Sequence, residues 1–392
     1  MLARLQNIYA MELSLLQSLI RIPSIFPNET ALAQWLYDYL RDAGWNARKQ
    51  SVGEHRFNVL AEKGNASRAV MLYGHLDTVP VYGEWDTPPF ELTERGDQLF
   101  GLGATDMKGG IFVILEAIKS LPERLDKTIK LAFCVDEEND SLGAYALSRD
   151  PFLQNVALVL VPEICDAFPR KAGAISVGLG RRGRVGISLA VPGISAHGAN
   201  PERGVNAIHE AYKVIAALDA MPLISHEKLG QSTQFIQEIH ARSGSLSLPD
   251  LCEVYLSRLL VLPETPDDAL RDVQEHLDRL YAQGILTPQR GKRVLATLAE
   301  RETPYYHPYI TDKRLPIIQR LLQRVQAFGE VCVGYGRSVA DENIFGGINQ
   351  IPTITLGPQG GNEHTANEWV SKQSLEERIA IYRDLIKHLE LE

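Results

Sequence analysis

The amino-acid sequence predicts an α/β protein, in which a sheet covered by helices is interrupted by a smaller α+β domain. In the first part of the chain, and again after residue 287, short and continuously apolar runs alternate with segments of helical periodicity. Such runs are typical of parallel strands that helices cover on both faces. After residue 178 the pattern changes, and apolar and polar residues alternate along the expected strand at 185–191. This change indicates a second sheet with one open face.

The composition is that of an ordinary globular protein. Of the 392 residues, 45% are hydrophobic and 23% are charged, which excludes disordered, collagen-like and coiled-coil proteins. The length corresponds to about two domains. Because 49 acidic and 40 basic residues leave a formal net charge of −9, the chain has no global electrostatic reason to bind nucleic acid or an anionic membrane.

Cysteine usage and the apolar runs predict a cytoplasmic protein. The four cysteines are far apart and form no C-x-x-C pair, so we expect reduced thiols. Residues 1–22 have the spacing of an amphipathic helix and not of a signal peptide. The longest apolar runs, such as residues 156–161, are far shorter than the ~20 residues of a membrane span.

The outer domain is expected to comprise residues 1–178 and 292–392. Its predicted strands and helices alternate along the chain, and each helix shows apolar residues at helical spacing. The strands are expected at 69–73, 129–135, 156–161 and 351–356, and the helices at 31–43, 110–121, 142–147, 314–328 and 375–389.

The inserted domain is expected to comprise residues 179–291. Its predicted strands lie at 185–191, 233–239 and 251–262, and its helices at 205–218 and 266–282. The stretch 178–183 matches G-x-G-x-x-G, but the residues after it form a strand pattern, and position 203 is Arg rather than an acid. A dinucleotide site needs a helix and an acid at these places, so we reject that interpretation.

Acidic residues and histidines follow the expected strands of the outer domain. These residues are His75 and Asp77, then Asp136, Glu137 and Glu138, then Glu163, and finally His364, while Asp106 precedes the helix at 110–121. In an open α/β sheet the carboxyl ends of the strands form the ligand crevice. Carboxylates gathered there repel one another unless a cation is bound, and mixed His and carboxylate ligands suit zinc, with Co²⁺ or Mn²⁺ as alternatives.

Five sequence motifs occur in the order and spacing of a known family. They are GHLDTVP at 74–80, GATDMKGG at 103–110, DEE at 136–138, Glu163, and EHTANE at 363–368. With these motifs the chain resembles the co-catalytic zinc amidohydrolases that include acetylornithine deacetylase, succinyl-diaminopimelate desuccinylase, aminoacylase-1 and glutamate carboxypeptidase. The resemblance covers nearly the whole chain. It implies a zinc-peptidase-like catalytic domain with a mixed sheet and an inserted dimerisation or lid domain.

The resemblance also implies a ligand set for two zinc ions. One ion would be bound by His75, Asp106 and Glu163, and the other by Asp106, Glu138 and His364, so that Asp106 bridges the two. Glu163 follows a proline where the family usually has Glu-Pro, and Asp166 is the alternative ligand. Asp77 would accept the second ring N–H of His75 and set its tautomer.

The implied reaction is hydrolysis of the amide bond of an N-acyl amino acid. In the family's mechanism Glu137 is the general base: it takes a proton from metal-bound water, and the resulting hydroxide attacks the carbonyl carbon. His197 would reach the active site of a partner subunit and donate to the oxyanion, which implies a homodimer.

Three further assignments concern the substrate. Arg258 is placed where the family often keeps an arginine that binds a substrate carboxylate, although it is equally compatible with an ordinary edge-strand arginine. The backbone of Gly360 and Gly361 could form a nest for a carboxylate, or the glycines merely turn the chain toward His364. Asp341 or Glu342 would favour a basic side chain in the substrate.

Two alternatives to an N-acyl amino acid deacylase stay open. The first is a dipeptidase or carboxypeptidase that uses the same dizinc site on a short peptide. The second is a catalytically inactive relative that binds metal or a small ligand, against which the intact Glu137 and the complete set of candidate ligands argue.

Overall fold

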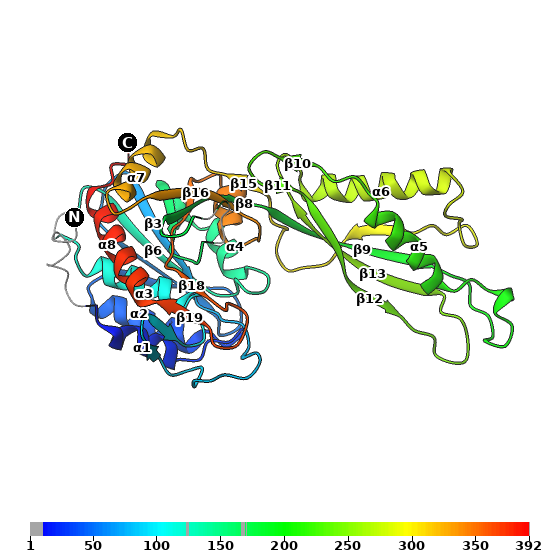
Figure 1. Cartoon of the computed structure of the whole chain (residues 1–392), viewed down its shortest axis with the longest axis horizontal. Helices are drawn as coiled ribbons and strands as arrows, with labels where there is room; N and C mark the ends of the chain where they lie inside the picture. The colour runs from blue at the N-terminus through cyan, green and yellow to red at the C-terminus, as the bar shows by residue number, and fades with distance from the viewer. Residues whose placement is uncertain (1–10, 123–124, 166–168, 170, 392) are drawn as a thin grey trace. The chain divides into compact units, whose positions relative to one another are not determined.

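The computed structural model describes residues 11–122, 125–165, 169 and 171–391 (Figure 1). The chain forms two compact units. The first unit consists of Met1–Arg181 and Ile310–Glu392, and the second unit is the inserted segment Arg182–Tyr309. Within the described residues no helix is both long and apolar enough to cross a membrane.

The second unit ends later in the chain than the predicted residue 291. Strand β14 (Leu295–Leu298) pairs antiparallel with β9 (Gly183–Pro192) and so adds an outer strand to the sheet of this unit. The apolar pattern of four residues was too short to indicate on which sheet they lie. The prediction that residues 292–309 belong to the outer domain is therefore wrong.

The first unit is built on a mixed sheet, which confirms the predicted α/β class. Its central strands pair in parallel, and its first two strands pair antiparallel at one edge. Every residue of two central strands, β3 and β6, is buried, as their largely apolar sequences predict. In the described residues the strands are β1 (Asn46–Ser51), β2 (Phe57–Lys63), β6 (Thr128–Cys134), β3 (Ala69–His75), β7 (Val156–Val161), β17 (Thr353–Thr355), β8 (Ile175–Arg181) and β15 (Tyr309–Ile310) in spatial order, with β16 (Val331–Gly336) paired to β8.

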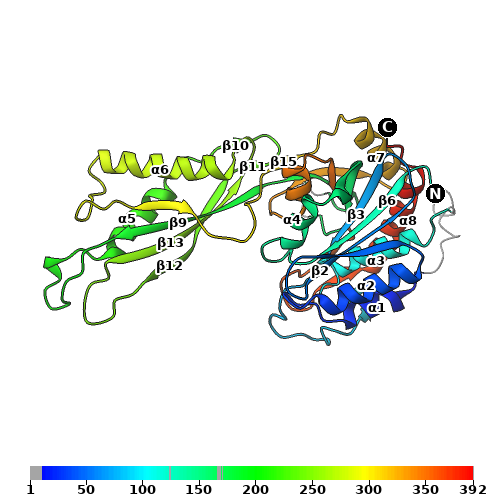
Figure 2. The same cartoon turned by 180° about the vertical axis from the view of Figure 1, so that it is seen from behind.

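Helices pack against this sheet and complete the core of the first unit. Helix α3 is buried along its whole length and contacts both α1 and α8 (Figures 1 and 2). It is apolar around most of its circumference because neighbouring helices as well as the sheet cover it. The helices are α1 (Leu13–Arg21), α2 (Thr30–Asp42), α3 (Lys108–Ile118), α4 (Leu142–Ser148), α7 (Pro316–Gln326) and α8 (Lys372–His388), with short turns η2 (Pro151–Leu153) and η4 (Ile344–Ile348).

A small antiparallel sheet, absent from the sequence prediction, lies beside the candidate site. Its strands are β18 (Gly360–Gly361), β19 (Trp369–Ser371), β5 (Gln98–Phe100) and β4 (Thr93–Arg95) in spatial order. Strand β5 precedes Asp106, and the β18–β19 hairpin contains His364. The sheet thereby joins two chain segments that are more than 250 residues apart in sequence.

The second unit has an antiparallel sheet in the order β12 (Thr233–Ala241), β13 (Leu251–Leu260), β9 and β14. Alternate side chains of its strands form a separate apolar core with the two helices, α5 (Ala207–Asp219) and α6 (Pro266–Ala282). The short pieces η3 (Pro201–Arg203), β10 (Ser225–His226) and β11 (Gly230–Gln231) lie in its loops.

Helix α6 begins at a capping box. The Thr265 side chain accepts the backbone N–H of Asp268, whose carboxylate accepts the N–H of Thr265. We predict that Thr265→Ala lowers the free energy of unfolding by about 1 kcal/mol, because the first turn of the helix loses an acceptor. Urea denaturation measures this change. Thr265→Ser, which keeps the hydroxyl, should unfold as the wild type does; an equal loss in both variants would exclude the cap as the cause.

Candidate metal centre

Three predicted ligands form one group that could hold a metal ion. Asp106, Glu138 and His364 each offer a ligand atom, and these atoms lie within 4.8 Å of one another. The His364 Nε2 atom is 3.0 Å from Glu138 Oε2 and 3.3 Å from Asp106 Oδ2. The three residues follow β5, β6 and β18, so the fold brings together loops that are distant in sequence.

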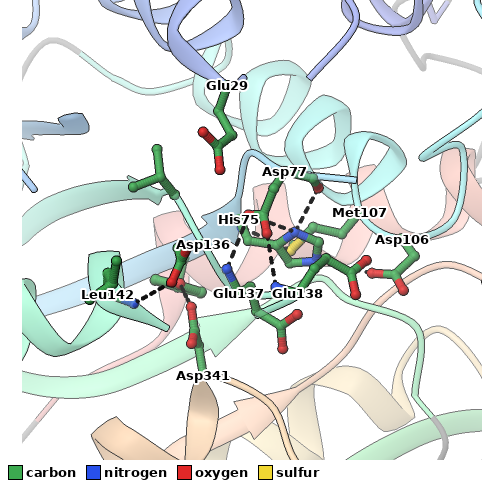
Figure 3. A network of polar contacts seen from close by, with 12 residues as sticks. Glu29, His75, Asp77, Asp106, Met107, Asp136, Glu137, Glu138, Leu142 and Asp341 are labelled. Atoms are coloured by element: carbon green, nitrogen blue, oxygen red, sulfur yellow. Dashed lines mark hydrogen bonds and ion pairs between the residues drawn. The ribbon is translucent and has the colours of Figure 1, made fainter. Parts of the chain in front are cut away.

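The second oxygen of Asp106 faces a second histidine. Asp106 Oδ1 is 3.0 Å from His75 Nε2 (Figure 3). Because Asp106 Oδ2 faces His364, the carboxylate lies between the two rings. This position, with one oxygen directed to each ring, is the one that a carboxylate shared by two metal ions would need.

The structure changes the part that Asp77 was expected to play. The His75 Nδ1 atom lies 3.0 Å from the backbone oxygen of Asp77, which can only accept a hydrogen bond. His75 therefore carries a proton on Nδ1, and its Nε2 atom faces the Asp106 carboxylate. The Asp77 carboxylate, 3.7 Å from Nδ1, instead accepts the backbone N–H groups of Glu137 at 3.1 Å and Glu138 at 2.8 Å.

The electrostatics of the site fit a bound cation. Burial raises the pKa of Glu137 well above its usual range, and the neighbouring carboxylates of Glu163 and Glu138 raise it further. Burial likewise raises the pKa of Glu138, whose Oε1 atom is buried without a hydrogen-bond partner. Carboxylates packed in this way must either take up protons or bind a cation. The oxygen and imidazole donors are those that zinc accepts.

Glu163 lies next to this group but is held by an arginine. It follows β7, is 8% exposed, and has its Oε1 atom 3.4 Å from Nη2 of Arg181. Burial raises the pKa of Glu163 well above its usual range, although Arg181 lowers it. The alternative ligand, Asp166, lies outside the described residues.

The sequence did not predict a network of ion pairs that adjoins the Glu137–Glu138 turn. The Arg56 guanidinium contacts both Glu29 and, at 2.9 Å, the Asp136 carboxylate. Asp136 adopts a φ of 77° and accepts the N–H of Leu142 at 3.0 Å. This network therefore holds Asp136, the residue immediately before Glu137, in a left-handed backbone conformation. The only signal for it in the sequence is the first acid of the DEE motif.

The two acids expected to select a basic substrate are inside the protein. Asp341 and Glu342 are both 0% exposed. Asp341 accepts the hydroxyl of Tyr73, and Glu342 accepts Nε of Arg181 at 3.1 Å and the Thr355 hydroxyl at 2.7 Å. The hypothesis that they bind a substrate side chain is therefore wrong.

Arg258 is also buried, with 0% exposure. Alternate residues of β13 face the core of the second unit, and position 258 is one of them. Its guanidinium pairs with Glu264 and, at 3.4 Å, with Asp272 on α6. The predicted contact with a substrate carboxylate does not agree with this position, because the guanidinium ties a helix to the sheet.

The glycines of β18 have a packing reason of their own. A Cβ atom on Gly360 would lie 2.0 Å from the Thr105 hydroxyl oxygen and 2.5 Å from the backbone oxygen of Trp369. Only glycine allows β18 to lie this close to the segment that leads to Asp106. A role of Gly360 and Gly361 in substrate binding stays a prediction.

His197 is an exposed residue in the loop after β9 of the second unit. Its Nδ1 atom accepts the backbone N–H of Ala199 at 3.1 Å. In the neutral ring the proton is then on Nε2, which makes this nitrogen a hydrogen-bond donor. This is the tautomer that the predicted oxyanion contact requires.

Comparison with known proteins identifies the family. The family model described as peptidase family M20/M25/M40 matches residues 71–388. The chain belongs to this family. A probable succinyl-diaminopimelate desuccinylase of Staphylococcus epidermidis is 24% identical over 418 residues and covers 96% of this chain and 97% of its own. An acetylornithine deacetylase of Klebsiella pneumoniae is 26% identical over 393 residues, with 95% and 96% covered.

The fold agrees with this assignment. The M20 family metallo-carboxypeptidase Sso-CP2 of Sulfolobus solfataricus superimposes with a TM-score of 0.78 at 19% identity, over 97% of this chain and 99% of that one. The resemblance drawn from the five motifs is thus confirmed, and the M20 chain is a metal-dependent hydrolase.

Metal binding should release protons. Hydrogen bonds with Asp106 and Glu138 raise the pKa of His364 to about 10, so the metal-free ring is protonated at neutral pH. A metal ion binds only the neutral ring, so affinity should rise with pH up to about 10. Zinc titration calorimetry in two buffers with different ionisation heats should show at least one proton released per chain. His364→Asn should release fewer, and heats that do not depend on the buffer would contradict the prediction.

Proposed function

We propose that this M20 chain hydrolyses the amide bond of N-acyl amino acids, as a deacetylase or desuccinylase, with two zinc ions per chain. The observation that carries the proposal is the Asp106 carboxylate between His75 and His364, with Glu137 close to His75. The names of the two curated relatives point to the same class of substrate.

The proposed ligands divide between two positions. His75, Asp106 and Glu163 would hold one ion, and Asp106, Glu138 and His364 the other. Bound zinc ions polarise a carbonyl group and lower the pKa of water, and Co²⁺ or Mn²⁺ can supply the same chemistry.

Glu137 is proposed as the general base. It is outside the group of three ligands, and Asp77 holds its backbone N–H, so its position does not depend on binding metal itself. Its raised pKa suits a group that takes a proton from the attacking water and delivers it to the leaving amine.

A second copy of the chain is proposed to complete the site. His197 would donate a hydrogen bond from its Nε2–H to the oxyanion that forms on the copy's substrate. Exposed apolar side chains on α5 and on the outer strand β12, namely Tyr212 (73% exposed), Phe235 (50%) and Ile239 (48%), suit a homodimer contact through the second unit. An outer strand with unpaired backbone groups is a surface that another chain can cover.

A peptidase is the second candidate. A dipeptidase or carboxypeptidase would use the same ligands and Glu137, and the solved relative of similar fold is named a metallo-carboxypeptidase. A catalytically inactive metal-binding relative is less well supported, since Glu137 and the candidate ligands are all present. The cytoplasmic location stays a prediction.

The function is tested by metal analysis and a substrate panel. The purified protein is expected to contain close to two zinc ions per chain and to release free amine from N-acetyl-ornithine or N-succinyl-diaminopimelate, but not after chelation. Faster cleavage of dipeptides would favour the peptidase. Bound metal with no turnover of any compound would favour the inactive relative.

Replacing the general base should abolish turnover but not metal binding. We expect Glu137→Gln to lower kcat by roughly 10²–10⁴-fold, because the amide cannot accept the proton of the attacking water. Glu54→Gln, at an exposed carboxylate, is the matched control and should retain wild-type activity. An active Glu137→Gln enzyme would contradict the assignment.

A mixing experiment tests the contribution of His197 from the second copy. His197→Ala should lower kcat by roughly 10²–10³-fold, as removal of an oxyanion donor does. When the His197→Ala and Glu137→Gln chains are mixed in equal amounts and allowed to exchange, one intact site should form in each mixed dimer. Roughly a quarter of wild-type activity should return. No recovery in verified mixed dimers would show that His197 does not act on the partner's site.

A further inference from the structure

We propose that Glu368 is a positioning residue that sets where the Asp106 carboxylate lies relative to His364. The inference rests on the proposed metal centre, and it concerns a residue in the EHTANE motif to which the reaction assigns no part. Glu368 precedes β19 and is 2% exposed, so its side chain is almost completely shielded from solvent.

The Glu368 carboxylate binds the backbone of the segment that ends at Asp106. Its Oε2 atom accepts the N–H of Gly103 at 2.7 Å. Its Oε1 atom accepts the N–H groups of Thr105 at 2.8 Å and Asp106 at 3.0 Å. The backbone oxygen of Glu368 accepts a fourth, from Gly101, at 3.1 Å. One residue thus satisfies four donors of a segment with little regular hydrogen bonding of its own.

The shape of that segment explains why it needs such support. Gly103 adopts a φ of 77°, and a Cβ atom there would lie 2.8 Å from the Thr78 side chain. The turn is therefore tight and closely packed. Without the Glu368 carboxylate, buried N–H groups of the turn would lose their acceptors, and a different backbone conformation that turns Asp106 away would be favoured.

Glu368 also belongs to the loop that carries His364. The two residues are four positions apart, and the turn between them is closed by hydrogen bonds from Asn362 Nδ2 to the Asn367 oxygen and from the Thr365 N–H to the Asn362 oxygen. Two of the three members of the metal-binding group, Asp106 and His364, are therefore linked through the Glu368 side chain, whose hydrogen bond to Asp106 spans 262 residues of sequence.

A carboxylate is suited to this position for a chemical reason. Its two oxygens accept several N–H groups and donate none. In Glu368→Gln an NH₂ group must face at least one of the three N–H donors. The change is nearly isosteric, so it removes acceptor capacity and charge without opening a cavity. Glu368→Asp keeps the charge but shortens the side chain, so that it cannot reach all three donors.

The test measures zinc affinity of the full-length protein by calorimetry and chelator competition, with no substrate present. Glu368→Gln should weaken zinc binding by roughly 10–100-fold, the range found when partners of metal ligands are replaced. Its metal-free form should keep the wild-type circular dichroism. Glu376→Gln, at an exposed carboxylate of α8, is the matched control and should bind zinc as the wild type does.

A second readout separates positioning from a merely structural role. In the cobalt-loaded enzyme a carboxylate shared by two ions couples their spins, so the Glu368→Gln electron paramagnetic resonance spectrum should lose coupling relative to wild type. Unchanged zinc affinity and an unchanged cobalt spectrum, with only a lower melting temperature, would overturn the proposal. If Glu368→Gln does not fold, the Glu368→Asp variant is measured in its place, and an unchanged zinc affinity in that variant would overturn the proposal. A wild-type protein that binds no zinc would overturn the proposed function as well.

Discussion

The structure depends on one electrostatic constraint: several buried carboxylates, which repel one another, lie together at the carboxyl ends of the central strands. Asp106, Glu138 and His364 lie within a few ångströms of one another, with Glu137 and Glu163 close by. In the absence of a cation this arrangement raises the pKa values of Glu137, Glu138 and Glu163 and that of His364 as well. The fold thus keeps together groups that repel one another, and it does so at the place where an M20 hydrolase needs a cation.

The groups are kept there by other carboxylates that bind backbone rather than metal. Asp77 accepts the N–H groups of Glu137 and Glu138, Asp136 accepts those of the following turn, and Glu368 accepts those leading to Asp106. Each such contact joins or closes a loop that carries a candidate ligand. Buried N–H donors are costly to leave unpaired, so the loops have few other conformations to adopt. Preorganisation of this kind holds ligand atoms in place before an ion arrives, which is what a hydrolytic site requires.

The second unit is stabilised by an apolar core of its own, which lies between one face of its sheet and two helices. The buried charged pair of Arg258 and Glu264 belongs to that core and not to a binding surface. By contrast, apolar side chains are exposed on the outer strand β12, and the imidazole ring of His197 is exposed in the loop after β9.

The sequence by itself determined the α/β class, the inserted domain, the family and the residues that gather in the metal-binding group, because apolar periodicity and strand-end motifs are local patterns. Only the tertiary structure decided which way individual side chains turn and what they meet. The charges of Arg258, Asp341 and Glu342 suggested substrate binding, yet all three side chains are buried. The pleat of β13 directs Arg258 inward, and Asp341 packs against Tyr73 of β3. Residues 292–309 belong to the second unit because β14 pairs with β9, which lies more than 100 residues earlier in the sequence. The contacts of Asp77 and Glu368 could not be foreseen either, since a hydrogen bond between segments distant in sequence leaves no periodic pattern and exists only once both segments have folded.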